Sequence, residues 1–151
     1  MHDEQAWSKV VSQMWRPAPQ DWLLTVLVRT AERAERTFAV TLNVGGLIIT
    51  GEVVSEAKYF EALNEAMRLA LAFAPESPGP LDPVIEELRA SKTDDQEVQH
   101  IHLIDAQVFA PGTGLIPTNG GVPWRGRLSA VDGFIVGRLK IGDQAAQPVV
   151  T

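Results

Sequence analysis

A change of hydrophobic period at Thr37 constrains the fold of this chain more than any other feature. Before it, WLLTVLVRTAERAER places apolar residues at helical spacing, which predicts a helix that begins near Asp21. The expected inner residues of this helix are Leu23, Val26, Leu27 and Ala31, and the expected outer residues are Glu32, Arg33, Glu35 and Arg36. After Thr37 the period becomes two, which is the pattern of a β-strand, in Phe38, Val40, Leu42 and Val44. A helix followed by strands predicts an α+β fold.

A Gly-Gly pair divides the strand region into two halves. Gly45 and Gly46 can supply the positive φ values of a two-residue turn, so we expect residues 38–54 to form a β-hairpin. Gly51 lies inside the second half and predicts a strong bend or a bulge there. Ser55 can then cap a helix. The apolar stripe of that helix is Phe60, Leu63, Met67 and Leu71.

The rest of the chain predicts a short helix and three further strands. PESPGPLDP breaks the preceding helix, and Asp82 with Pro83 offers a cap and a first position for a short helix to about Arg89. SKTDDQE is expected to be a loop. Strand patterning returns in EVQHIHLIDAQVFA, and the loop PGTGLIPTNGGVP follows it. Two last strands, WRGRLSA and FIVGRLKI, are joined at Val131, Asp132 and Gly133.

This order of elements predicts either a small five-stranded β-barrel of SH3-like or Sm-like type or a strongly bent antiparallel sheet. In both, an N-terminal helix precedes the strands, and a helical, acidic insertion at about residues 55–96 lies between the second and third strands. We expect one core, shared with the helix from Asp21. Its expected members are Phe38, Val40, Leu42, Ile49, Val53, Ile101, Leu103, Trp124, Leu128, Phe134 and Val136.

The chain is expected to have three parts. Residues 1–20 form an amphipathic helix and a proline-containing linker, residues 21–141 a single domain, and residues 142–151 a flexible tail. The helix has one apolar stripe, which ends at RPAPQ because two prolines cannot continue it. This stripe either packs on its own domain or docks on a partner, and the sequence leaves both open. Its residues are Trp7, Val10, Val11, Met14 and Trp15.

The composition is that of a globular protein, with 45% hydrophobic and 21% charged residues in a chain of 151. No apolar run reaches the roughly 18 residues that span a bilayer, so no membrane contact is expected. The absence of cysteine excludes disulfides and thiolate metal sites, and the acidic N-terminus lacks the pattern of a secretory signal, which predicts the cytoplasm. The formal net charge of −6 disfavours nucleic acid as a partner.

His100 and His102 are the candidate metal ligands of interest, because residues two apart on a strand share one face. A metal site would need a third ligand, and Asp105 points to the opposite face unless a bulge intervenes. The structural alternative is favoured. It places both histidines on the wetter face of a strand whose Ile101 and Leu103 point inward.

The other polar motifs predict no catalytic or cofactor site. GTGLIPTNGG lacks both the Gly-Lys-Ser/Thr of a phosphate loop and the following helix of a dinucleotide site. Ser129 and Asp132 have no histidine that any motif would bring to them. We therefore expect a non-enzymatic protein with no cofactor and no metal.

Charge is distributed unevenly along the chain, which predicts two unlike faces. Acids dominate residues 76–97, whereas basic residues gather near the end of the chain. These are Arg125, Arg127, Arg138 and Lys140. Alternation places Trp124 inward, so Arg125 and Arg127 point outward together, either as a solvated strand face or as an interaction surface. The candidate interaction residues are Arg125, Arg127, Glu86, Glu87, Asp94, Asp95, Trp7 and Trp15.

Three segments together resemble a known family. TLNVGGLIITGEVVSEAKYFEAL, HIHLIDAQVF and WRGRLSAVDGFIVGRL are similar, in that order, to the core of the gas vesicle accessory protein U family. The resemblance covers roughly residues 37–139 and does not extend to the stripe at residues 7–15. It implies a cytoplasmic protein that works on gas vesicles, in a family of which some members self-assemble and gather vesicles into clusters.

Two functions of different classes follow from these observations. The first is a non-enzymatic assembly protein that binds itself and the gas vesicle shell or other gas vesicle proteins. The alternative is a small-barrel domain that binds RNA or a small ligand. The net charge of −6 and the lack of stacking aromatics favour the first.

Overall fold

A computed structural model of the chain describes residues 3–14, 19–91 and 97–140. In these residues the chain forms helices and an antiparallel sheet, which confirms the α+β class. The helices are α1 (Asp3–Met14), α2 (Trp22–Ala34), α3 (Glu56–Ala70) and α4 (Asp82–Ala90). The strands are β1 (Phe38–Val44), β2 (Leu47–Val53), β3 (His100–Ala110), β4 (Gly114–Ile116), β5 (Val122–Arg127) and β6 (Gly133–Val136). The predicted tail at residues 142–151 lies outside the described residues.

The predicted hairpin is confirmed. Strands β1 and β2 pair in antiparallel register with Leu42 opposite Ile49, and Gly45 and Gly46 form the turn with φ values of +57° and +85°. These are conformations that glycine adopts without steric cost. The carboxylate of Asp132 accepts a hydrogen bond from the Gly45 amide at 2.9 Å, which ties this turn to the start of β6.

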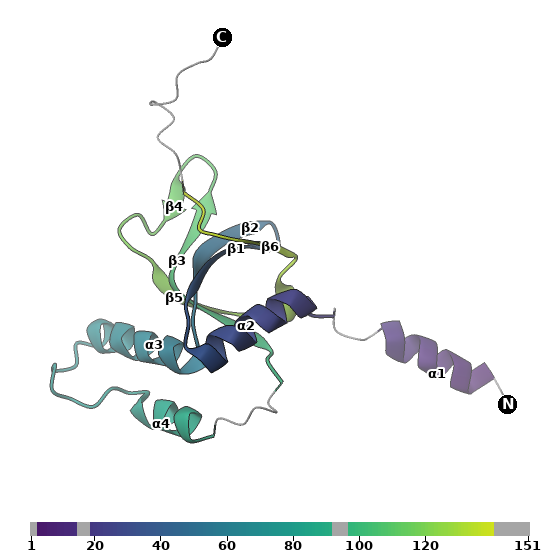
Figure 1. Cartoon of the computed structure of the whole chain (residues 1–151), viewed down its shortest axis with the longest axis horizontal. Coiled ribbons are helices and arrows are strands. Elements are labelled where there is room, and N and C mark those ends of the chain that lie inside the picture. The colour runs from purple at the N-terminus through teal and green to yellow at the C-terminus, as the bar shows by residue number, and fades with distance from the viewer. Residues whose placement is uncertain (1–2, 15–18, 92–96, 141–151) are drawn as a thin grey trace, which may run out of the picture.

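The strands form an open six-stranded antiparallel sheet (Figure 1), so they do not close into the five-stranded barrel that was one of the two predicted arrangements. Its order is β4-β3-β2-β1-β6, and β5 pairs with the same edge of β3 as β4 does. Among the described strands, no pairing joins β5 to β6, because a single 3₁₀ turn at Leu128–Ala130 sends the chain to the far edge. The likeness to SH3 or Sm barrels stays a prediction.

Three predicted boundaries in the C-terminal half are wrong. The expected loop after β3 contains strand β4, because Gly114–Ile116 folds back to pair with Val108–Ala110. The expected strand WRGRLSA ends at Arg127, where the 3₁₀ turn begins. The expected strand FIVGRLKI ends at Val136, because Gly137 turns the chain with a φ of +122°.

The irregularity predicted at Gly51 is confirmed and lies opposite a bulge in β3. Thr50 pairs with Gln107 but Glu52 pairs with Ile104, so β3 carries one extra residue in this interval. Asp105, inside the bulge, has a φ of +50°. A β-carbon at Gly51 would lie 3.1 Å from the backbone of β3, which explains the glycine.

One hydrophobic core lies between α2 and the sheet. Its buried members are Leu24, Val28, Ala31, Val40, Leu42, Ile49, Val53, Ile101, Leu103, Ala106 and Leu128. Phe38, Trp124 and Phe134 pack against it, so the predicted core is confirmed except at Val136. Val136 is 66% exposed, because β6 is an edge strand of the open sheet.

The side of α2 that was predicted to face the core is wrong. Leu23 and Val26 are exposed, and the helix buries Leu24 and Val28 instead, together with Ala31 as expected. The first two turns are apolar on every side, so spacing alone does not identify the buried stripe. The start of the helix is well fixed, since the Asp21 carboxylate accepts hydrogen bonds from the amides of residues 23 and 24.

The helical insertion between β2 and β3 consists of α3 and α4. The predicted cap of α3 is confirmed, because the Ser55 hydroxyl accepts a hydrogen bond from the Lys58 amide. The predicted cap of α4 is wrong: Leu81 occupies that position, and Asp82 begins the helix itself. The Asp82 carboxylate accepts a hydrogen bond from Asn64 of α3 at 2.7 Å, so it joins the two helices.

The chain after β6 crosses the outer face of the sheet (Figure 1). Two buried threonines lie beneath it. The Thr41 hydroxyl donates to the Gly137 carbonyl, and the Thr50 hydroxyl accepts from the Leu139 amide, each at 2.9 Å. Arg138 then reaches the β3 bulge and contacts the Asp105 carboxylate at 3.2 Å. This crossing therefore satisfies and buries both threonine hydroxyls.

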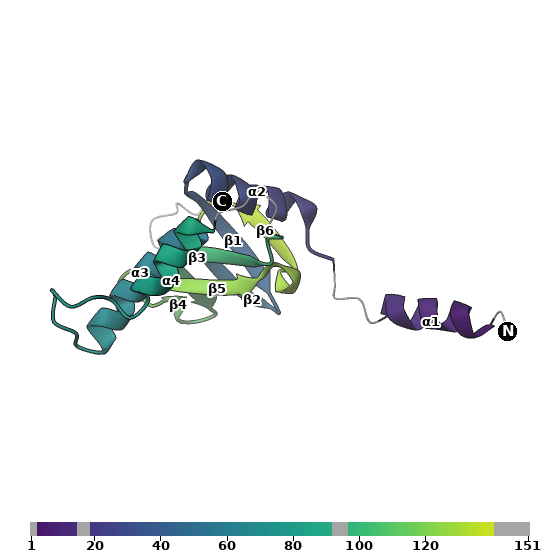
Figure 2. The same ribbon diagram turned by 90° about the horizontal axis from the view of Figure 1, so that it is seen from below.

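Helix α1 stands apart from the sheet and from the other helices (Figures 1 and 2). Its side chains Trp7, Val10 and Val11 are all exposed. No helix in the described part of the chain is both long and apolar enough to span a bilayer.

Candidate interaction surfaces

The β3–β5 ladder brings the two candidate histidines together with the two candidate arginines. His100 lies opposite Arg127 and His102 lies opposite Arg125 in antiparallel register. Both arginines are exposed, as the alternation predicts. Helix α3 packs against the same two strands, so this polar face is partly covered by the helix.

His102 is buried under α3 and does not lie on a wet face. Its side chain is 3% exposed, and its ring centroid lies 4.9 Å from that of Tyr59. The sequence prediction therefore holds for the partly exposed His100 and is wrong for His102. The reason is that α3 covers the outer face of β3 at this point, while Ile101 and Leu103 face the core as expected.

Arg125 and His102 form a specific polar contact. The Arg125 Nε donates a hydrogen bond to His102 Nε2 at 3.1 Å, which requires a neutral ring with its proton on Nδ1. Burial first, and then the charges of Arg125 and His100, lower the pKa of His102 to about 3. The pKa of His100 is also lowered, first by burial and then by Arg125. Neither ring is a cation at neutral pH.

Asp105, the candidate for a third metal ligand, has other partners. The bulge in β3 does displace Asp105, but its carboxylate accepts a hydrogen bond from the Gly121 amide at 2.7 Å and pairs with Arg138. Within the described ranges, no three metal-ligating side chains come together.

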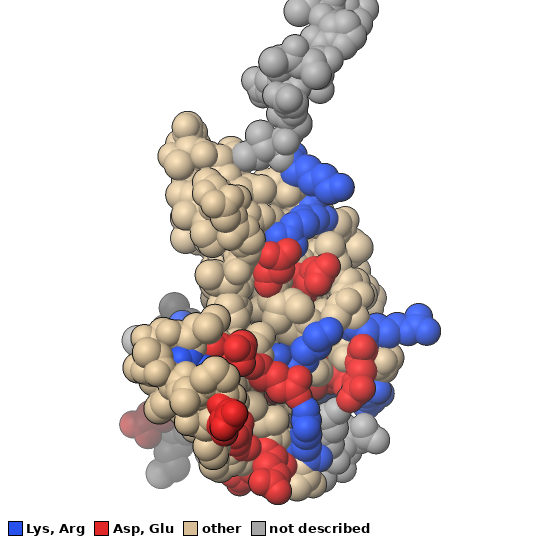
Figure 3. All heavy atoms as spheres, turned by 90° about the vertical axis from the view of Figure 1, so that its left-hand side faces the viewer, with Lys and Arg blue, Asp and Glu red and all other residues tan. Residues whose placement is uncertain are grey.

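The candidate acids are only partly placed. Glu86 and Glu87 are exposed on α4, whereas Asp94, Asp95 and Trp15 lie outside the described residues. Figure 3 shows acidic and basic side chains next to one another over the same face of the molecule. The prediction of two unlike faces does not hold for this face.

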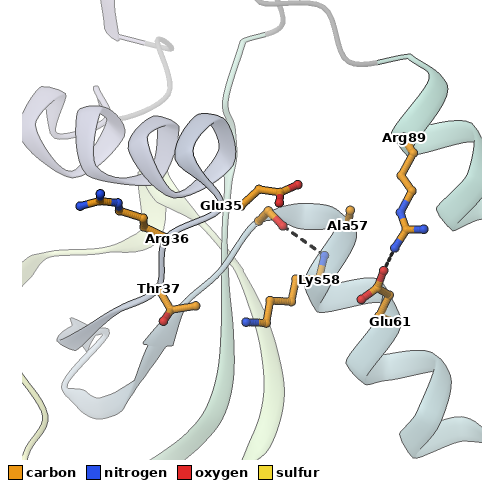
Figure 4. Close-up of a pocket in the computed structure, with 8 residues that line it drawn as sticks. Glu35, Arg36, Thr37, Ala57, Lys58, Glu61 and Arg89 are labelled. Atoms are coloured by element: carbon orange, nitrogen blue, oxygen red, sulfur yellow. Dashed lines mark hydrogen bonds and ion pairs between the residues drawn. The ribbon is translucent and has the colours of Figure 1, made fainter.

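A hollow lies between the connection from α2 to β1 and the helices α3 and α4 (Figure 4). It has a volume of about 490 Å³ and a mostly charged lining. Arg89 of α4 pairs with Glu61 of α3 across one side of it. The lining carries both signs of charge, so it favours no single kind of ion. Its residues are Glu35, Arg36, Thr37, Ser55, Ala57, Lys58, Glu61 and Arg89.

Helices α1 and α2 both expose apolar side chains. The sequence left open what the stripe of α1 packs against, and it placed part of the exposed side of α2 in the core. On α1, Trp7 is 67% exposed, and on α2, Trp22 is 74% exposed. Val26 of α2 is 49% exposed beside Trp22, one turn further along the helix. Sequence reasoning missed the α2 surface because it placed Val26 in the core. No local signal could have corrected this, because the buried stripe depends on which elements pack against the helix.

Comparison with protein families identifies the chain. The family model described as Gas vesicle protein GvpU-like matches residues 21–139. The chain belongs to this family. The resemblance to the accessory protein U family is thus confirmed, and this GvpU-like protein is a gas vesicle-related protein of a family that is not known to be enzymatic. The match begins at Asp21, so it excludes α1. Comparisons with curated proteins and with solved structures gave no match.

Proposed function

We propose that this GvpU-like protein is a non-enzymatic gas vesicle accessory protein that binds itself and gas vesicles in the cytoplasm and so promotes their clustering or assembly. The family match over residues 21–139 carries this proposal. In it, residues 21–141 are the structural domain, and residues 1–20 are an arm that serves association. The alternative of a small-barrel domain for RNA or a small ligand has less support, since the sheet is open.

The exposed charges supply one means of association. Arg127 of β5 and the acids Glu86 and Glu87 of α4 are all exposed, so the arginine of one copy can meet the acids of another. Each such pair contributes only about 0–1 kcal/mol, and many together give reversible assembly. Arg127 is the better candidate of the two arginines, because Arg125 already donates to His102.

Vesicle binding is tested by flotation. Purified intact gas vesicles are mixed with the protein and centrifuged at low speed, so that vesicles and whatever they bind collect at the surface. We expect the protein in the floating layer and clusters of vesicles under the light microscope, both increasing with protein concentration. An unrelated acidic protein of similar size is the control. Recovery of the protein only below the vesicles would refute the proposal.

A further inference from the structure

Helix α2 has an apolar surface opposite the one that it buries. Leu24, Val28 and Ala31 face the core, so Trp22 and Val26 face away from it, 74% and 49% exposed. Arg29 continues this outer stripe for one more turn and is exposed as well. A tryptophan and a valine in line on an exposed helix face form a surface that favours a protein partner.

Helix α1 has an apolar stripe and, in the described residues, nothing that covers it. Trp7, Val10 and Val11 are exposed, and Glu4 lies at the N-terminal end of the same side of the helix. The helix has 12 residues, and isolated helices shorter than about 12–15 residues are marginal in water. Helix α1 would therefore be stabilised if its apolar stripe packed on another surface.

The two stripes have matching spacing when the helices run in opposite directions. Along α1, the residues Glu4, Trp7 and Val11 follow at intervals of three and four. Along α2 in reverse, Arg29, Val26 and Trp22 follow at the same intervals. Each set spans about 10.5 Å at 1.5 Å per residue.

An antiparallel arrangement therefore aligns unlike charges and apolar pairs at once. Glu4 lies against Arg29, Trp7 against Val26, and Val11 against Trp22. A parallel arrangement would place Glu4 against Trp22 and Val11 against Arg29, so it would leave both charges beside apolar groups. Complementary charge and spacing thus select the antiparallel direction.

We propose that α1 of one copy packs antiparallel on the Trp22–Val26–Arg29 stripe of α2 in a second copy, and that the exchange is reciprocal. The inference rests on the proposed self-association and names the segments that carry it. A second copy is favoured over the same chain because α1 stands beyond the end of its own α2 (Figures 1 and 2). The sequence between them includes Pro17 and Pro19, and the residue before a proline is biased towards extended backbone and away from helix.

Mixing two variants tests this arrangement with the full-length chain. Trp7→Lys disables the arm of one chain, and Val26→Lys disables the receiving stripe of the other. In 1 M salt, which screens the exposed charge pairs, either variant alone should sediment as a 16.5 kDa monomer at concentrations where the wild type forms dimers. A 1:1 mixture should form a heterodimer, because the intact α1 of one chain can still use the intact α2 of the other.

A matched control places the same charge elsewhere on α1. Gln5 lies two residues before Trp7, about 200° around the helix, so Gln5→Lys should associate like the wild type. Circular dichroism verifies that every variant is folded. Both substituted side chains are exposed, so none is expected to unfold the domain.

The outcomes that would contradict the helix pairing can be told apart from the one that would contradict self-association. If the wild type associates and both variants associate equally well, the helix pairing is wrong and self-association stands. If the variants are monomeric and the mixture stays monomeric, α1 of one copy does not pack on α2 of another, and the proposed pairing is wrong. If the wild type is monomeric at every concentration, the proposed self-association fails together with this inference.

Discussion

At the level of single residues, the contact between Arg125 and His102 decides how the outer face of β5 can be used. A buried neutral histidine has a nitrogen that must accept a hydrogen bond, and the Arg125 Nε supplies the donor at 3.1 Å. Arg125 is thus a structural residue although it is exposed. Its neighbour Arg127 has a partly exposed histidine opposite it and is the freer of the two for contacts with other molecules.

We predict unequal effects of removing the two arginines. Arg125→Ala leaves the His102 Nε2 without its donor, and an unsatisfied buried polar atom costs about 1–3 kcal/mol. Arg127→Ala should change the free energy of unfolding by less than about 0.5 kcal/mol, as exposed substitutions usually do. Urea denaturation at pH 7 measures both. Equal losses for the two variants would show that the contact with His102 contributes nothing to stability.

A second residue-scale prediction concerns pH. Burial lowers the pKa of His102 from 6.5 to about 3, so the unfolded chain takes up a proton at a higher pH than the folded chain does. The contribution of His102 to stability is full above pH 6.5 and decreases progressively as the pH falls towards about 3. Between pH 7 and pH 5 this residue should reduce the free energy of unfolding by about 2 kcal/mol at most.

The measurement compares the wild type with His102→Leu by urea denaturation at pH 7 and pH 5. The variant is expected to be less stable at pH 7, because it deprives Arg125 of its acceptor. The quantity to compare is the change in the free energy of unfolding between pH 7 and pH 5. All other titratable groups contribute alike to this change in both proteins. That change should be smaller in the variant. An identical change in both would mean that His102 titrates equally in the folded and unfolded chains.

At the level of elements, the sequence predicted those that local chemistry specifies and missed those that need distant partners. The turn at Gly45 and the cap at Ser55 follow from residues within a few positions. Strand β4 could not be predicted, because its pairing with residues 108–110 decides it rather than its own pattern. The buried stripe of α2 and the burial of His102 depend on which elements pack against them, and neither is encoded locally.

Strand β5 shows how tightly two of its residues are coupled. The Trp124 ring lies over Gly126, where an added β-carbon would be 2.2 Å from the Cη2 atom of the ring. Gly126→Ala should therefore displace the ring from the core edge and cost about 1–3 kcal/mol. Gly133→Ala is the matched control, because no atom lies within 4 Å of its added carbon. Thermal denaturation should show a lower midpoint for the first variant only. Equal midpoints would mean that the ring moves aside without loss.

At the scale of the whole molecule, two kinds of surface are proposed to act together. The α1 and α2 stripes are mainly apolar and would join two copies. The exposed charges on β5 and α4 would join such dimers to one another, since they remain accessible outside the stripes. Interactions of these two kinds respond differently to salt, because screening weakens exposed ion pairs and leaves apolar burial in place.

Salt should therefore dissociate the assembly in one step and stop at the dimer. Raising the ionic strength from 0.1 M to 1 M shortens the Debye length from about 10 Å to about 3 Å, which removes most of the attraction between exposed charges. Light scattering should show large species at low salt and dimers at high salt. Arg127→Glu should give dimers even at low salt, whereas Trp7→Lys should abolish the dimer at high salt. Dissociation of the wild type to monomers at 1 M salt would mean that charge, and not the helix stripes, holds the two copies together.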